Sequence, residues 1–205
     1  MQSRYSKLNQ ALHWTTALCM FALLPLAWVM VNAKRGPTTG SLFAWHETLG
    51  AIVLLVTVFR IAWRFVDGPP AYPPAVRIWE RRLAHAAYWV FFAALIYMPA
   101  TGFLTAELGG HRPRLFDALP TPLLLAPDKH QAALFAQLHL WGQWLIYALI
   151  ALHLSAVAFH LTFRRDGVLG RMLPAYAAEP AGAAARPPDA RPAPAYQAMR
   201  SPGRP

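Results

Sequence analysis

Three histidines stand in an almost wholly apolar stretch of the chain, AQLHLWGQWLIYALIALHLSAVAFH at residues 136–160. They are His139, His153 and His160. In an α-helix, the 14 residues from His139 to His153 leave a net rotation of about 40° and a rise of about 21 Å. Their imidazoles therefore leave one face of one helix at two different levels. Such rings can bind a metal or transfer protons, and the alternative for each is a hydrogen bond to a neighbouring helix.

The chain that carries these histidines is too apolar for an ordinary soluble domain. Of its 205 residues, 56% are hydrophobic, and they form four runs long enough to cross a bilayer, which takes about 20 residues. We predict an all-α integral membrane four-helix bundle, with helices at about 8–31, 42–65, 81–106 and 131–164. The first run resembles a signal peptide, but its apolar part exceeds the usual length of about 7–15 residues. We therefore expect it to remain as a helix.

The basic residues indicate how the helices are oriented. The net charge of +10 lies largely in short clusters beside the apolar runs and in the C-terminal segment, which is typical of membrane topology and argues against nucleic-acid binding. With the N-terminus inside, nine basic residues flank the inner helix ends and five the outer ends, so we predict that both termini are cytoplasmic. The inner residues are Arg4, Lys7, Arg64, Arg77, Arg81, Arg82, Arg164, Arg165 and Arg171; the outer ones are Lys34, Arg35, Arg112, Arg114 and Lys129.

The last part of the chain differs in composition from the rest. Residues 175–205 are rich in Ala, Pro and Arg and hold little that a folded domain could bury. We predict a disordered tail there, following a four-helix transmembrane domain at 1–174.

Helix direction sorts four histidines into two levels. His13 lies near the start of an outward helix and His153 late in an inward one, so both lie near the inner surface. By the same reasoning, His46 and His139 lie near the outer surface. Each pair alone lacks the third and fourth ligands that structural zinc prefers. A haem supplies four equatorial nitrogens and needs only two axial ligands, so two haems across the bilayer suit this arrangement.

Arg60 supports an inner site for an anionic group. It lies 14 residues after His46, hence on nearly the same face and about 21 Å deeper, which is the level of His13 and His153. A buried arginine needs an anion, and the propionates of a haem would supply one. The alternative is an arginine that reaches to the inner interface beside Arg64.

Several motifs, in this order, resemble the bacterial cytochrome b561 family. They are RYSKLNQALHW at the start, HETLG from His46, MPATGF from Met98, the helix with His139 and His153, and GVLGRMLP after it. The resemblance covers roughly residues 4–174. It implies a di-haem, b-type cytochrome of the bacterial inner membrane, with His13, His46, His139 and His153 as the axial ligands of the haem iron. It also implies electron transfer to or from a membrane quinone such as ubiquinone.

The resemblance leaves two functions open. Some members of the family pass electrons from superoxide to ubiquinone, and the five outer basic residues could give that face a field that collects a small anion. Related proteins are haem-bearing membrane subunits that link a hydrogenase or dehydrogenase to quinone, and the same basic residues could dock such a partner or be merely solvated. With both axial positions filled by histidine, we expect electron transfer rather than oxygen activation.

Two further histidines are candidates for a quinone or proton site on the inner side. His160 lies seven residues beyond His153, on nearly the same face and about 10 Å deeper. It could hydrogen-bond a quinone or relay its protons, or it could lie at the interface without a role. His85 begins the third helix on the inner side and could serve the same purpose, compete as an inner ligand, or remain interfacial.

Overall fold

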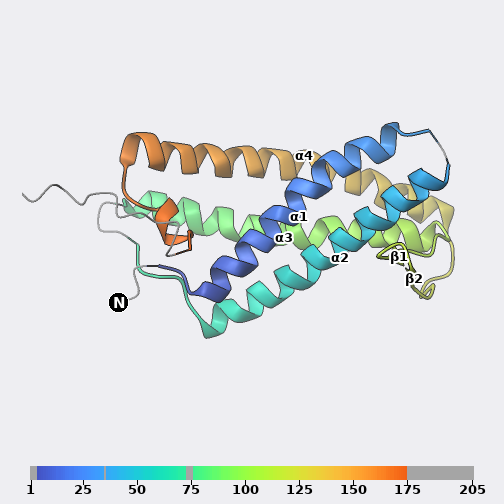
Figure 1. The fold of residues 1–205 in the computed structure, drawn as a ribbon, viewed down its shortest axis with the longest axis horizontal. Coiled ribbons are helices and arrows are strands. Elements are labelled where there is room, and N and C mark those ends of the chain that lie inside the picture. Colours follow the sequence, from blue (N-terminus) through green and yellow to red (C-terminus); the bar gives the residue numbers. More distant parts are fainter. Residues whose placement is uncertain (1–3, 35, 73–75, 175–205) are drawn as a thin grey trace, which may run out of the picture. The chain divides into compact units, whose positions relative to one another are not determined.

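The computed structural model describes residues 4–34, 36–72 and 76–174. The segment predicted to be a disordered tail, 175–205, and Arg35 of the outer basic set lie outside them. Within the described residues, four helices are long and apolar enough to cross a membrane, which confirms the prediction of an all-α membrane protein (Figure 1). They are α1 (Lys7–Asn32), α2 (Pro37–Val66), α3 (Ile78–Leu108) and α4 (Lys129–Phe159).

Local sequence explains where these helices begin. Ser6 precedes α1, and its hydroxyl oxygen accepts the N–H of Asn9 at 3.3 Å. Asp128 precedes α4 in the same way and accepts two N–H bonds, which hold the pKa of its carboxyl below the usual value. Pro37 is the first residue of α2, where its missing N–H costs nothing. This proline explains why α2 begins at residue 37 rather than near residue 42.

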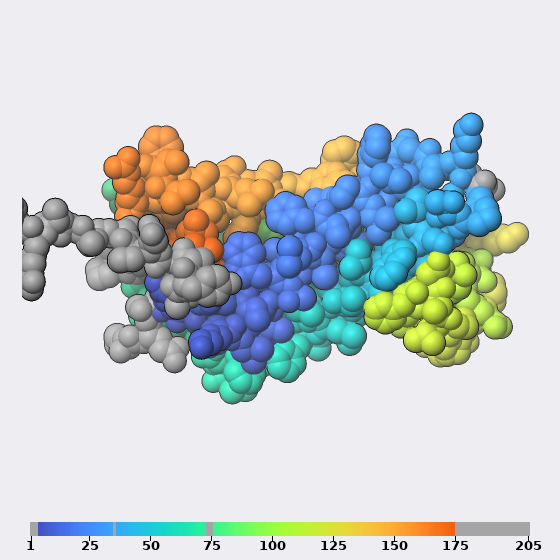
Figure 2. Space-filling view, in the orientation of Figure 1, coloured from blue at the N-terminus to red at the C-terminus, as the bar shows by residue number. Residues whose placement is uncertain are grey.

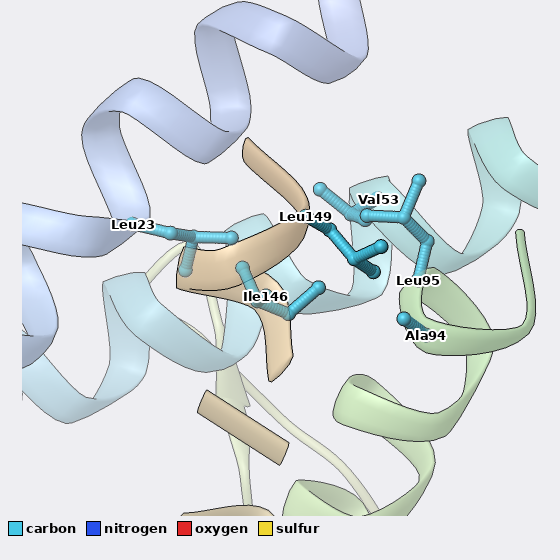
Figure 3. Packing of buried hydrophobic residues seen from close by; sticks show 6 residues of the cluster. All are labelled: Leu23, Val53, Ala94, Leu95, Ile146 and Leu149. Carbon is cyan, nitrogen blue, oxygen red and sulfur yellow. The ribbon is translucent and has the colours of Figure 1, made fainter. Parts of the chain in front are cut away.

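The apolar core lies between the two levels at which the histidines were expected. Backbone packing is close between α1 and α2, α2 and α3, and α3 and α4. One buried cluster takes side chains from all four helices, as Figure 3 shows: Leu23, Val53, Ala94, Leu95, Ile146 and Leu149. Along α4, Ile146 and Leu149 lie between His139 and His153. The two histidine levels are therefore separated by an apolar layer.

At one end of the bundle, which we call the loop end, a small hairpin packs on α2 (Figure 2). Its strands are β1 (Arg114–Leu115) and β2 (Leu119–Pro120), joined through Phe116 and Asp117, both with φ of 56°. A bulky residue is rarely found in this left-handed region. The N–H of Phe116 donates to Thr48 of α2 at 2.7 Å, which ties the turn to the helix.

The opposite end, which we call the N-terminal end, is closed by the segment that follows α4. This segment comprises the π-helix η1 (His160–Arg164), the 3-10 helix η2 (Leu169–Arg171) and residues up to 174. It turns back toward α1, where the N–H of Tyr5 donates to the carbonyl of Arg171 at 3.1 Å and the indole N–H of Trp14 to that of Met172 at 2.9 Å. Chain segments far apart in sequence thus meet beside His13.

Candidate functional site

The first histidine pair joins α1 to α4 toward the N-terminal end. The ring centres of His13 and His153 are 6.2 Å apart, with the ring planes inclined at 56°. Phe91 of α3 packs edge-on against His153, with ring centres 5.7 Å apart. Two imidazoles from different helices therefore lie next to each other, with an aromatic ring of a third helix beside them.

The second pair joins α2 to α4 toward the loop end. The ring centres of His46 and His139 are also 6.2 Å apart, and the planes are inclined at 76°. Because His139 and His153 lie about 21 Å apart along α4, the two pairs are separate sites. The structure thus brings together the same rings that helix direction assigns to common levels.

The spacing within each pair fits two ligands on opposite sides of one metal ion. A histidine nitrogen lies about 2 Å from the metal it binds, and the ring centre lies roughly 1 Å farther back, so two such rings have centres about 6 Å apart. Within the described residues, no group of three His, Cys, Asp or Glu side chains could hold a metal ion. Two-ligand sites of this kind suit a haem, which brings its other four ligands.

Two further observations favour an added group at these sites. The pairs cross from α1 to α4 and from α2 to α4, which are not among the closely packed helix pairs of the described bundle. In addition, Nδ1 of His46 is buried and finds no hydrogen-bond partner among the described residues. A buried polar atom without a partner is expected where a ligand completes the site.

A cationic cavity lies at the N-terminal end beside the first pair. Arg60 donates to the hydroxyl of Thr16 at 3.2 Å, one turn from His13, and its guanidinium lies 5.3 Å from the centre of the Phe92 ring. Arg64 lies 4.8 Å from the ring centre of Tyr88. Among the described residues, neither arginine forms an ion pair with a carboxylate. The cavity is lined by Tyr5, Asn9, Arg60, Arg64, Tyr88, Phe92 and Met172.

This cavity is suited to an anion. Two guanidinium groups there lack a carboxylate among the described residues, and a partly buried cation is stabilised by a negative partner. Burial raises the pKa of the Tyr5 phenol, so its hydroxyl stays protonated and can donate a hydrogen bond. The sequence predicts that Arg60 lies at the level of His13. Its hydrogen bond to Thr16, one turn from His13, agrees with that prediction.

Comparison with known proteins identifies the family. The family model described as prokaryotic cytochrome b561 matches residues 4–175. The chain belongs to the prokaryotic cytochrome b561 family. It is 25% identical to cytochrome b561 homolog 2 of Escherichia coli (strain K12) over 171 residues, which cover 83% of this chain and 91% of the relative. It is also 26% identical to the probable superoxide oxidase CybB of Yersinia pestis over 183 residues, covering 85% and 98%.

Family membership and the four apolar helices establish the general role of the protein. It is a multi-pass protein of the bacterial inner membrane that binds haem b and transfers electrons. A second relative in Escherichia coli (strain K12), cytochrome b561 homolog 1, is 24% identical over 175 residues, covering 84% of this chain and 98% of the relative.

The remaining predicted residues of this cytochrome b561 lie apart from the histidine pairs. His160 begins η1, and its Nδ1 donates to Asp166 at 2.6 Å. The side chain of Asp166 is nearly buried, and the π-helix that begins at His160 ends at Arg164, followed by Arg165 with φ of 48°. His85 lies on the exposed face of α3 and accepts the indole N–H of Trp89 at 3.1 Å. The structure therefore does not bring His85 to His13 or His153.

At the loop end, fewer basic side chains lack an acidic partner than the sequence suggests. Arg114 pairs with Asp117 at 2.8 Å, and its backbone N–H donates to Glu47 at 3.3 Å. Glu47 also lies 3.0 Å from Nε2 of His111. These contacts attach the loop to α2 next to His46, and they leave Lys34, Arg112 and Lys129 as the described basic residues that carry the positive field.

Sequence reasoning missed the polar residues that contact the predicted ones. Thr101 lies 3.1 Å from Nδ1 of His139, and Asp166 holds His160. Glu107 is fully buried, and its carboxylate accepts the N–H groups of Leu124 and Leu125 at 2.7 and 3.2 Å. Two sequence signals pointed to them: Thr101 lies within the MPATGF stretch, and Glu107 is a charged residue at the end of an apolar run.

Proposed function

We propose that the chain conducts electrons across the inner membrane through two haem b groups, one held by His13 and His153 and the other by His46 and His139. The observation that carries this proposal is the equal spacing of 6.2 Å in both pairs. When bound, each haem supplies an iron that changes between its ferric and ferrous forms by one electron. His13 and His153 would hold one haem and His46 and His139 the other, and with two histidine ligands each haem would transfer electrons rather than bind oxygen.

The N-terminal end faces the cytoplasm in this proposal, and the cationic cavity there binds carboxylates. The nine basic residues that flank this end support the orientation. Arg60 and Arg64, which lack a carboxylate partner among the described residues, would hold the propionates of the group bound by His13 and His153. Arg60→Gln should then lower the haem content of that site alone.

Quinone is the electron acceptor at the cytoplasmic end. Reduction of a quinone needs two electrons and two protons, so its site requires a proton donor at the membrane surface. His160, held by Asp166 at the end of α4, is the residue that could supply protons there. His85, on the exposed face of α3, is the alternative donor.

Superoxide is the proposed electron donor at the loop end. Two superoxide anions each lose one electron and become O₂, and one ubiquinone takes up both electrons with two protons to form ubiquinol. The similarity to a probable superoxide oxidase supports this assignment, as do the basic side chains of Lys34, Arg112 and Lys129, which attract a small anion. The activity belongs to residues 1–174, with no requirement for 175–205.

The test uses the purified protein in detergent. We expect two haems per chain, low-spin spectra in both oxidation states, and complete extraction by acid–acetone, because the chain has no C-x-x-C-H attachment motif. Given superoxide and ubiquinone, the protein should form ubiquinol, and rising ionic strength should slow the reaction by screening the basic residues. One haem per chain would refute the two-site proposal. Two haems without ubiquinol formation would instead favour a membrane subunit for a partner dehydrogenase or hydrogenase.

A further inference from the structure

One turn of α3, residues 98–102, forms a polar support for the ring of His139. Nδ1 of His139 lies 2.9 Å from the carbonyl oxygen of Met98 and 3.1 Å from the hydroxyl oxygen of Thr101. At Gly102, a Cβ atom would lie 3.1 Å from Cε1 of the same ring. This turn lies within the MPATGF stretch that the sequence singles out, and the proposed function assigns it no role.

The contacts determine which nitrogen of His139 carries the proton. A carbonyl oxygen can only accept, so Nδ1 must donate to Met98 and Nε2 is left with its lone pair. Thr101 is nearly buried, and its single proton is directed to the carbonyl of Tyr97 at 2.9 Å or of Met98 at 3.0 Å. Its oxygen therefore offers a lone pair to Nδ1–H. The ring thus has two acceptors for one proton.

His46, the opposite member of the pair, has no such support. None of the described residues forms a hydrogen bond with the His46 ring, whichever of its two nitrogens takes the ligand. Within this pair, the 98–102 turn is therefore the support that sets the orientation and basicity of a ligand. An acceptor on the far nitrogen of a metal-binding imidazole raises the basicity of the ligating nitrogen.

We infer that Thr101 is a positioning residue that tunes the reduction potential of the haem held by His46 and His139. The inference rests on the proposed function, because it takes His139 to be an iron ligand. By accepting from Nδ1–H, Thr101 makes His139 a stronger donor, which stabilises the ferric state and lowers the potential. The hydroxyl proton of Thr101 is already satisfied by backbone carbonyls of its own helix, so the contact with His139 is additional to what the threonine itself requires.

The experiment is a redox titration of the haem-loaded protein, followed by visible absorbance and by the EPR signal of the ferric form. Thr101→Val keeps the shape of the side chain and removes the acceptor, so one of the two potentials should shift upward. Thr101→Ser keeps the hydroxyl and should retain the original potential. Thr105→Val is the matched control: Thr105 lies one turn further along α3, and its hydroxyl donates to the carbonyl of Thr101 at 2.8 Å. It should shift neither potential.

His139→Ala, measured beside these variants, separates the inference from the proposal on which it rests. If His139→Ala removes one component and Thr101→Val shifts that same component, the inference holds. Unchanged potentials in Thr101→Val, an equal shift in Thr105→Val, or a shift of the other component would overturn it. If His139→Ala leaves both components, the proposed function itself fails. Should Thr101→Val not load haem, Thr101→Ala removes the same hydroxyl without added bulk and is judged by the same criteria.

Discussion

A single added methyl group at Gly142 should disrupt the contact between α3 and α4. Gly142 of α4 is buried against α3, and a Cβ atom there would lie 2.6 Å from Cε1 of Tyr97 and 2.6 Å from the sulfur of Met98. The methionine can turn away at little cost. The tyrosine ring cannot move freely, because its hydroxyl donates to the carbonyl of Leu138 at 2.8 Å.

The cost of Gly142→Ala follows from these two constraints. Overpacking a core costs about 1–3 kcal/mol, and loss of the Tyr97 hydrogen bond adds about 1 kcal/mol. We therefore expect a destabilisation of about 2–4 kcal/mol, which corresponds to a fall in Tm of roughly 5–15 °C for a protein of this size. Because Met98 also supports His139, the haem that we propose for this site should be lost before the other proposed haem on heating.

Thermal unfolding in detergent, followed by circular dichroism and by the visible spectrum, measures both effects. The matched control is Gly40→Ala in α2, where the added Cβ would lie 3.6 Å from the nearest atom of Arg114, an ordinary contact. Its Tm should be unchanged or slightly raised, since alanine favours the helix. A Tm of Gly142→Ala equal to that of the control would refute the close approach of α3 and α4.

Three further predictions concern the ends of the helices. Truncation after Pro174 should leave the Tm nearly unchanged, whereas truncation after Asp166 should lower it, because residues 167–174 supply the carbonyls that bind Tyr5 and Trp14. Glu107→Ala should cost about 1–3 kcal/mol in thermal unfolding by removing the acceptor of two N–H groups, and Glu107→Gln should cost less. For Asp128 the lowered carboxyl pKa means that its stabilisation is present above the unfolded pKa of about 3.9 and is lost as the pH falls through the lower native value. The Tm difference between the original protein and Asp128→Ala should therefore be constant near neutral pH and vanish in acid.

How far the sequence could predict the structure depended on whether a feature is local. The level of each histidine follows from helix rise and direction, so sequence reasoning assigned His13 to the level of His153, and the structure brings the two rings together. The same reasoning placed Arg60 near His13. These conclusions need only the residue spacing and the number of helices that cross the membrane.

Features that depend on helix rotation or on a returning loop could not be predicted. The contact of Thr101 with His139 requires that a particular face of α3 turn toward α4, and no spacing in the sequence sets that rotation. The cavity with Arg60 and Arg64 is completed by Met172, which reaches it only because the chain turns back after η1. The hairpin at Phe116 could not be predicted from the sequence because its turn lacks the usual Asn or Gly.

The central claim is that the four histidines form two separate iron sites, each with one ligand from α4. A redox titration of the single alanine variants, with haem counted per chain, tests it most directly. His13→Ala and His153→Ala should lose one and the same redox component, and His46→Ala and His139→Ala should lose the other, so each variant retains one bis-histidine haem. If His13→Ala and His46→Ala abolished the same component and spared the other, the pairing and the proposed path across the membrane would both be wrong.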